Sequence, residues 1–238
     1  MNRIENQVIL LTGASKGIGK VTAKKLSGLN PKLILVSRNI NDLEKIRKEF
    51  SVIDSNLLLI GANVSVEEDC QRIVSEAAAK FGTIDVLINN AAQFAHGKIE
   101  KMDIEDFDRV FATNIRGVFI LTKLTLPFMI KQSSGTIVNI SSTAGKRGYP
   151  GGSAYTASKF ALNGFSECLI KEVREHNIRV VTISPSMVDT KEKPIKEQKE
   201  TGKGIYMRAE DVADSIVSAI ALPQRALIKD IEIWGTNP

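Results

Sequence analysis

The stretch Thr12-Gly13-Ala14-Ser15-Lys16-Gly17-Ile18-Gly19 decides the fold, because it joins an apolar run at residues 8–12 to a helical pattern that begins at Gly17. Its glycines have the spacing GxxxGxG, which lets the backbone come close to a bound group. A helix that begins here presents free N–H groups and the positive end of its dipole to an anion. The loop therefore predicts a site for the diphosphate of a dinucleotide rather than a plain tight turn.

Apolar runs and helical patterns alternate along the chain, outward from this loop. Runs that predict strands lie at residues 8–12, 32–37, 57–60, 84–88, 136–140, 179–183 and 230–234. Helical patterns lie at residues 17–26, 41–50, 65–80, 104–131, 153–175 and 212–222. Apolar strands separated by helices indicate a parallel sheet with both faces covered. The predicted fold class is α/β, a doubly wound, Rossmann-type parallel sheet of about seven strands with helices on both faces.

Three local signals refine the predicted helix boundaries. Asn41 with Glu44, and Ser65 with Glu68, have the spacing of a capping box and predict two helix starts. Pro127 stands near the end of the longest helical pattern, where its ring and its missing N–H predict a bend or a break.

The composition is ordinary for a globular chain, with 43% hydrophobic and 25% charged residues and a formal charge of +5. No long basic block carries interleaved aromatic residues, so we expect no nucleic-acid partner. The apolar runs are too short to span a bilayer, and the first residues form no apolar signal region, which favours the cytoplasm. Cys70 and Cys168 stand alone, so the sequence predicts neither a disulfide framework nor a metal site.

The end of the second predicted strand indicates which dinucleotide binds. An acidic residue there would hold the ribose 2′-hydroxyl of NAD, but this chain has Ser37-Arg38 instead. The Arg38 guanidinium can bind a 2′-phosphate through several donors, and Lys16 adds a second positive charge nearby. The pair predicts NADP(H) in preference to NAD(H).

Tyr155 and Lys159 are four residues apart in a helical pattern and therefore share one helix face. A nearby ammonium favours the phenolate and lowers the pKa of a tyrosine, which could then exchange a proton with a carbonyl or alcohol oxygen. Ser141 and Ser142 follow the fifth strand, where a hydroxyl could donate a hydrogen bond to the same oxygen. These residues predict proton transfer at a carbonyl, although a lone Tyr-x-x-x-Lys pattern also suits a tyrosine that packs beside a surface lysine.

Together, TGASKGIG at 12–19, NNAA at 89–92, the Tyr–Lys pair and Ser142 resemble the short-chain dehydrogenases/reductases along nearly the whole chain. The chain looks most similar to the 3-oxoacyl-[acyl-carrier-protein] reductase and sepiapterin-reductase-like members. The resemblance implies an enzyme that reduces a carbonyl to an alcohol by hydride transfer from NADPH, with Tyr155 as the proton donor. The implied catalytic residues are Asn114, which organises a proton-relay water, Ser142, Tyr155 and Lys159.

The expected cofactor contacts combine the glycine-rich loop with positions that the resemblance implies. They are Gly13, Ser15, Lys16, Gly17, Ile18, Gly19, Ser37, Arg38, Asn63, Val64, Asn90, Ala91, Ala92, Tyr155, Lys159, Pro185, Val188 and Thr190. Ala92 and Ser186 depart from the family pattern, which usually has glycine at both positions. Neither change removes a catalytic group, but Ser186 could alter the nicotinamide pocket.

We expect residues 1–238 to form a single dinucleotide-binding and catalytic domain. Residues 191–204 are dense in lysine and glutamate, which predicts a mobile substrate loop at 191–206; a solvated excursion explains the same composition. The resemblance implies a small-molecule or acyl-thioester carbonyl substrate and a homo-tetramer or homo-dimer. It leaves open whether an acyl carrier protein takes part.

Two other functions suit some of the same residues. An NAD-dependent alcohol dehydrogenase would use the same tyrosine, although Arg38 and Lys16 argue against it. A non-catalytic dinucleotide sensor could keep the glycine-rich loop, but it would not need the Tyr155–Lys159 pair.

Overall fold

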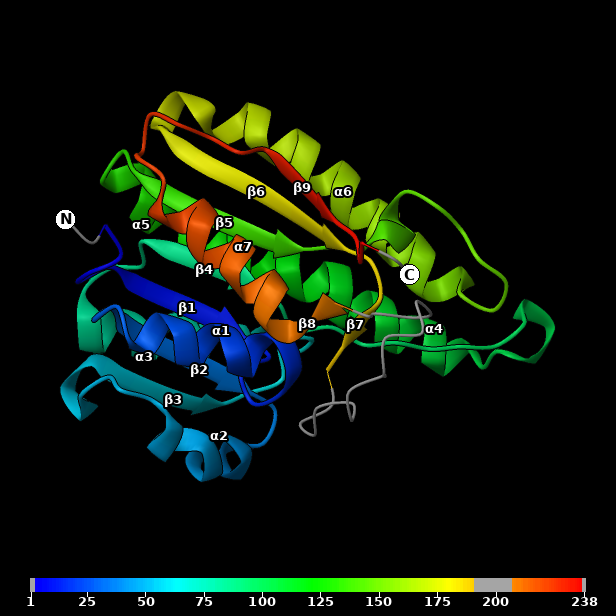
Figure 1. The fold of residues 1–238 in the computed structure, drawn as a ribbon, viewed down its shortest axis with the longest axis horizontal. Helices are drawn as coiled ribbons and strands as arrows, with labels where there is room; N and C mark the ends of the chain where they lie inside the picture. Colours follow the sequence, from blue (N-terminus) through cyan, green and yellow to red (C-terminus); the bar gives the residue numbers. More distant parts are fainter. Residues whose placement is uncertain (1–2, 191–206, 237–238) are drawn as a thin grey trace.

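The structure is a computed structural model that describes residues 3–190 and 207–236. Seven parallel strands form its central sheet in the order β3-β2-β1-β4-β5-β6-β9 (Figure 1). The strands are β1 (Val8–Thr12), β2 (Lys32–Ser37), β3 (Leu57–Gly61), β4 (Val86–Asn89), β5 (Gly135–Ile140), β6 (Ile178–Pro185) and β9 (Asp230–Ile233). Two short strands, β7 (Val188–Asp189) and β8 (Met207–Arg208), pair separately. The predicted doubly wound sheet is confirmed, and the predicted loop at 191–206 lies outside the described residues.

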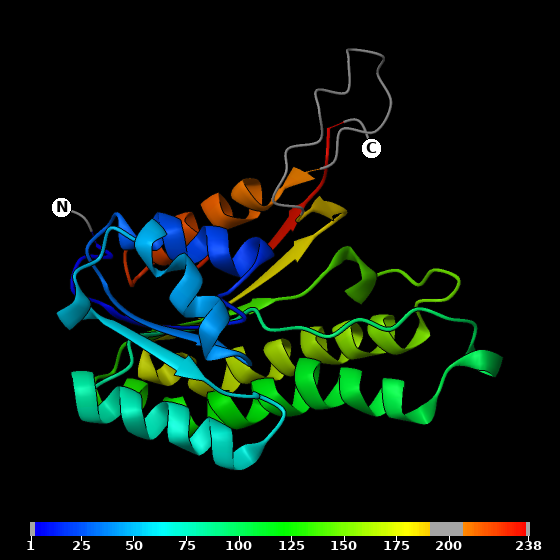
Figure 2. The same ribbon diagram turned by 90° about the horizontal axis from the view of Figure 1, so that it is seen from below.

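Helices cover both faces of the sheet (Figure 2). They are α1 (Gly17–Ser27), α2 (Ile40–Ile46), α3 (Glu67–Phe81), α4 (Ile104–Phe111), α5 (Val118–Lys131), α6 (Ser153–Val173) and α7 (Ala209–Ala221). Residues of α1, α2 and α7 share one apolar cluster, and residues of α3, α5 and α6 share the other. Alternate residues of one strand belong to different clusters: Ile9 and Leu11 to the first, Val8 and Leu10 to the second. This burial on both faces explains why β1 is apolar throughout.

Both predicted capping boxes are wrong. Asn39 caps α2, and its side chain accepts a hydrogen bond from the backbone N–H of Asn41, so the helix begins two residues earlier than predicted. Ser65 caps nothing, because its hydroxyl donates to Asn63 Oδ1 at 2.9 Å, and Val66 occupies the N-cap position of α3. In both places a competing local hydrogen bond overrides the sequence spacing.

The long helical pattern at 104–131 divides at a π-helical turn, Ala112–Gly117. A Cβ added at Gly117 would lie 2.5 Å from the carbonyl oxygen of Val64, so the turn packs directly against the segment that follows β3. Pro127 lies inside α5 without ending it, because the helix continues to Lys131. Of the predicted bend or break at Pro127, the break is therefore wrong, and the helical pattern divides instead at the turn that carries Asn114.

No helix in the two described ranges is long and apolar enough to cross a membrane.

Arg179 of β6 is a buried charge that supports the carboxyl end of α7. Its guanidinium donates to the carbonyl oxygens of Ile220, Leu222 and Ala226, and also to Thr136 Oγ1. Arg179 is only 4% exposed, and this burial lowers the pKa of its guanidinium. Its hydrogen bonds therefore replace the solvation that the charge has lost.

We expect Arg179→Met to lower the free energy of unfolding by about 3 kcal/mol, because it leaves buried carbonyl oxygens without donors. Urea unfolding followed by circular dichroism measures the change. The exposed Arg174 provides a matched control, and Arg174→Met should change stability by less than about 0.5 kcal/mol. Equal stabilities of the two variants would contradict the assigned role of Arg179.

Candidate active site

The site forms where the order of the strands reverses, at the carboxyl ends of β1 and β4, which are neighbours in the sheet. Thr12 Oγ1 accepts hydrogen bonds from the backbone N–H groups of Asn90 and Ala91, both at 3.0 Å. The Asn90 side chain donates back to the carbonyl oxygen of Thr12 at 2.8 Å. These bonds hold the ends of the two strands together and fix the floor of a crevice.

The glycine-rich loop is too crowded for side chains at two positions. Gly13 has a φ of +66°, and a Cβ there would also lie 2.9 Å from Ala91 Cα. A Cβ at Gly19 would lie 2.1 Å from the carbonyl oxygen of Gly13. Lys16, the N-cap residue of α1, makes no side-chain capping hydrogen bond. The tight loop thus presents the positive end of α1 to a bound anion.

A pocket of about 700 Å³ lies against this loop. Its lining includes fourteen of the expected cofactor contacts: Gly13, Ser15, Lys16, Gly17, Ile18, Gly19, Ser37, Arg38, Asn63, Val64, Asn90, Ala91, Ala92 and Thr190. The volume is in the range of small-molecule and cofactor sites, and the donors and positive charges suit the phosphates of a dinucleotide.

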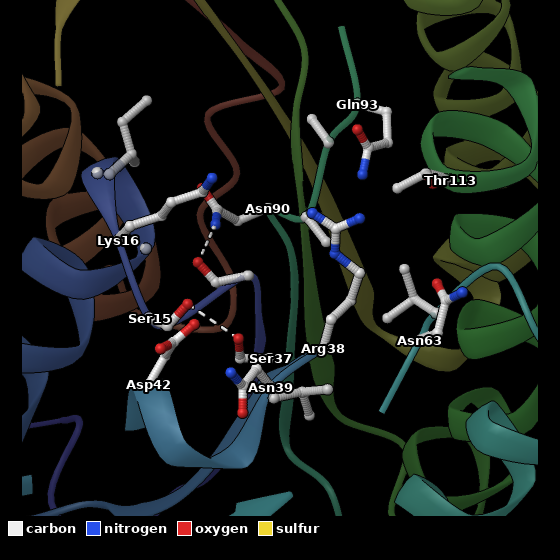
Figure 3. A pocket seen from close by; sticks show the side chains of 18 of the residues that line it. Ser15, Lys16, Ser37, Arg38, Asn39, Asp42, Asn63, Asn90, Gln93 and Thr113 are labelled. Atoms are coloured by element: carbon white, nitrogen blue, oxygen red, sulfur yellow. Dashed lines mark hydrogen bonds between the residues drawn. The ribbon is translucent and has the colours of Figure 1, made fainter. Parts of the chain in front are cut away.

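Arg38 enters the pocket from the end of β2, between Asn90 on one side and Asn63 and Thr113 on the other (Figure 3). It is exposed and forms no ion pair or hydrogen bond with another residue that the structure describes. Its donors are therefore available to a ligand. Asp42 lines the same pocket, with its carboxylate 3.5 Å from Lys45 Nζ, so the pocket contains one acidic group as well.

A second pocket, of about 230 Å³, adjoins the first and shares Ile18, Asn90 and Ala92 with it. The remaining expected cofactor contacts, Tyr155, Lys159, Pro185 and Val188, line this smaller pocket together with Ser142. The structure therefore brings every expected cofactor contact to one of two neighbouring cavities. Among the described residues, no group of three or more His, Cys, Asp or Glu could hold a metal ion.

Tyr155 and Ser142 both line the smaller pocket, and the Ser142 hydroxyl acts on the phenol to lower its pKa. Ser142 Oγ also accepts from the backbone N–H of Ala144 at 3.1 Å, which orients the hydroxyl. The neighbouring Ser141 instead pairs with Asn163 Oδ1 at 2.6 Å, so its hydroxyl is already engaged. Of the two serines, Ser142 is therefore the one positioned beside the tyrosine.

Lys159 lies one turn after Tyr155 on α6, as predicted, and is 2% exposed. Its Nζ donates to the carbonyl oxygen of Ile140 at 2.7 Å and lies 5.6 Å from the centre of the Tyr155 ring. Burial lowers the pKa of Lys159 to about 8. The buried lysine thus ties α6 to the end of β5, directly before the serines.

The pKa of Tyr155 differs in direction from the sequence-based expectation. Burial raises the pKa above its ordinary value, and the Ser142 hydroxyl opposes this rise. The physical reason is that the Lys159 ammonium is directed toward a backbone carbonyl, while the phenol lies in a partly buried pocket. The chain alone therefore keeps Tyr155 protonated near neutral pH, which is the form that donates a proton.

Asn114 lines neither cavity and is almost fully buried. Its Oδ1 accepts from the backbone N–H of Gln93 at 2.8 Å, and its Nδ2 donates to the carbonyl oxygen of Gln93 and to Ser158 Oγ, both at 3.0 Å. Ser158 in turn donates to the carbonyl oxygen of Tyr155 at 2.7 Å. Asn114 therefore links the loop after β4 to the helix that carries the tyrosine.

Sequence reasoning missed several lining residues. Asn39, Asp42, Gln93 and Thr113 line the larger pocket, and Ile140 lines the smaller one. Most of them lie within a few residues of an expected contact, so proximity in sequence was the available signal. Asp42 gave no signal of its own, because the helix dipole already explains an acidic residue in the first turn of a helix.

Comparison with known proteins gives a consistent result over the whole length of the chain. A family model described as short chain dehydrogenase matches residues 7–201. An NADP-dependent 3-hydroxy acid dehydrogenase of Schizosaccharomyces pombe is 32% identical over 247 residues, which cover 100% of this chain and 95% of that protein.

Solved structures share the fold. A metagenomic short-chain oxidoreductase in complex with NADP is 27% identical, with a TM-score of 0.85 over 98% of this chain and 100% of that chain. A 3-ketoacyl-(acyl-carrier-protein) reductase from Brucella melitensis, complexed with NADH, is also 27% identical. Its TM-score is 0.86, over 98% of this chain and 99% of that chain.

Proposed function

The chain belongs to the short-chain dehydrogenase family, whose members are oxidoreductases, and from this premise we propose that it reduces a carbonyl to an alcohol with NADPH. One observation carries the proposal. Tyr155, Ser142 and buried Lys159 line one cavity, which adjoins a pocket suited to a dinucleotide. A proton donor is thus held next to the place where a nicotinamide would lie.

The chain's own residues would supply proton transfer and positioning. When bound, NADPH supplies the hydride for the carbonyl carbon. Tyr155 donates its hydroxyl proton to the carbonyl oxygen, and Ser142 donates a hydrogen bond to the same oxygen as negative charge develops. Lys159 binds the nicotinamide ribose hydroxyls, and its bond to Ile140 holds α6 in place. Asn114 positions the tyrosine through Ser158 and organises a relay water.

The preference for NADP(H) rests on Arg38. Its unpaired guanidinium in the larger pocket suits a 2′-phosphate, and no acidic residue occupies its position at the end of β2. The two similar solved structures contain NADP in one case and NADH in the other, so family membership alone does not choose between them.

A substrate panel tests the proposed reaction. Ketones, acyl thioesters and pterins are mixed with the protein and either NADPH or NADH, and the loss of reduced nicotinamide absorbance is followed. We expect consumption of NADPH with at least one carbonyl class. Tight NADPH binding without turnover of any carbonyl would favour the dinucleotide sensor instead.

The physiological setting of this reaction is part of the proposal. We propose one catalytic domain that acts in the cytoplasm on a small-molecule or acyl-thioester carbonyl. We also propose a homo-dimer or homo-tetramer, because three helices, α4, α5 and α6, each carry an exposed aromatic side chain. These are Phe107 on α4, Phe119 on α5 and Phe160 on α6.

We expect Phe119→Glu to shift the mass in solution toward that of a monomer, because it replaces one of these aromatic side chains with a charge. Sedimentation velocity measures the shift. Ile53→Glu is the matched control, since Ile53 is equally exposed but precedes β3, away from α5. An unchanged mass in the Phe119 variant would show that Phe119 does not lie in the subunit interface.

A further inference from the structure

Phe94 presents an exposed aromatic ring directly beside the catalytic tyrosine. The centres of the Phe94 and Tyr155 rings are 5.1 Å apart, and the ring planes meet at 64°. Phe94 nevertheless remains 54% exposed, so part of its ring is open to a ligand. The ring therefore offers an apolar surface at the point where a substrate approaches Tyr155.

The loop that carries Phe94 is held on both sides of the ring. Gln93 is bonded at its N–H and its carbonyl by Asn114. Ala95 is buried in a small apolar cluster with Val110 and Ala154, the residue immediately before Tyr155. Phe94 thus projects from a backbone segment whose two neighbours are anchored, and the ring is positioned before any substrate binds.

A second ring lies next to Phe94. His96 stacks on it, with ring centres 6.3 Å apart and an angle of 8° between the planes. The N–H of Gly97 donates to the carbonyl oxygen of Gly151 at 2.9 Å, and a Cβ at Gly151 would lie 2.5 Å from His96 Cε1. The two rings therefore form a fixed aromatic wall, defined as Phe94 and His96, beside the smaller pocket.

The charged side chains of the smaller pocket and of the loop after β5 are already engaged. Among the described residues, Lys159 is the only charged one that lines the smaller pocket, and it donates to Ile140. Outside the pocket, Lys146 bridges the carboxylates of β9, and Arg147 lies over the ring of Trp234. Within the described ranges, the pocket thus offers no uncommitted cation that would bind a substrate carboxylate or phosphate.

We propose that the substrate is a neutral carbonyl compound with an aromatic ring next to the carbonyl, and that this ring packs against Phe94. The inference rests on the proposed carbonyl reduction and specifies its substrate class. Aromatic pairs prefer edge-to-face or offset contact, and the exposed Phe94 ring beside Tyr155 can make such a contact with an aromatic substrate. An anionic substrate would meet the apolar wall without a counter-charge.

Three ketones of different character test this substrate class. Acetophenone, cyclohexyl methyl ketone and 3-oxobutanoate are assayed with NADPH, in the wild-type chain and in Phe94→Ala and Phe94→Leu. We expect the wild type to prefer acetophenone over the cyclohexyl ketone by about tenfold in kcat/KM, and over 3-oxobutanoate by more. Phe94→Ala should lower kcat/KM for acetophenone by about tenfold and for the cyclohexyl ketone by less than about threefold.

The leucine variant separates the ring from its bulk. Phe94→Leu keeps an apolar side chain of similar size, so it should lose the preference for acetophenone while it keeps most of the activity on the cyclohexyl ketone. A preference of the wild type for 3-oxobutanoate, or equal losses for all three ketones in Phe94→Ala, would overturn the inference and leave the carbonyl reduction intact.

A binding measurement distinguishes failure of the inference from failure of the proposed function. Saturation-transfer NMR compares 1-phenylethanol with 3-hydroxybutanoate on the NADP-loaded protein, in the wild type and in Phe94→Ala. If no carbonyl of the wider substrate panel is reduced but 1-phenylethanol binds in a Phe94-dependent manner, the substrate-class inference stands and the carbonyl reduction fails. If neither turnover nor Phe94-dependent binding is seen, both are overturned.

Discussion

Tyr155→Phe is expected to lower kcat for carbonyl reduction by about a thousandfold, because general-acid catalysis by a positioned side chain contributes on this order. The variant removes one oxygen atom and keeps the ring in its place beside Phe94. NADPH binding should remain within about threefold of the wild type, because Tyr155 lines the smaller pocket and not the pocket of the phosphate-binding loop. Steady-state kinetics and a fluorescence titration with NADPH measure the two effects separately.

Tyr149→Phe is the matched control for this experiment. Tyr149 stands in the loop before α6, is 40% exposed and lines neither of the two pockets. Its variant should retain nearly full activity. Turnover in Tyr155→Phe above about a tenth of the wild-type rate would be too high for loss of the proton donor and would refute the assigned role.

Arg38→Asp is expected to weaken NADPH binding by about a hundredfold while NADH binding changes little. The variant removes a charge-assisted hydrogen bond to the 2′-phosphate and places a second negative charge beside that phosphate. The 2′-phosphate is the only difference between the two cofactors. The variant should therefore lose affinity for NADPH alone. Dissociation constants for both cofactors, measured by fluorescence at one fixed ionic strength, give the comparison.

Asp42→Asn is a control that should change the relative affinity for NADPH in the opposite direction. The carboxylate lines the same pocket as Arg38, and its removal should strengthen NADPH binding relative to NADH. Equal losses for the two cofactors in Arg38→Asp would contradict the proposed NADP(H) preference and favour the NAD-dependent alcohol dehydrogenase.

The fold and most of the candidate site could be predicted because their signals are local. Each apolar run in the sequence corresponds to a strand of one sheet, and the glycine-rich loop lies between β1 and α1 as expected. Parallel strands deliver their carboxyl ends to one edge, so residues that follow different strands meet there. That rule brings Ser142 at the end of β5 near the residues that follow β4.

Helix boundaries could not be predicted as well, because competing side-chain hydrogen bonds decide them. Ser65 has the right spacing for a capping box, but its hydroxyl is used by Asn63. The π-helical turn at Ala112–Gly117 carries no sequence signal of its own and depends on contact with the carbonyl of Val64. Both outcomes depend on neighbours that a spacing rule does not include.

The sequence by itself determined the doubly wound sheet, the anion-binding loop and the placement of Tyr155 and Lys159 on one helix face. These features follow from hydrophobic periodicity and backbone geometry, which act over a few residues. Only the tertiary structure decided that Asn114 bonds to Gln93 and Ser158, that Lys159 donates to Ile140, and that Phe94 lies against Tyr155. Those contacts join segments far apart in the chain, and they exist only once packing has brought the loops after β4 and β5 to the same edge of the sheet.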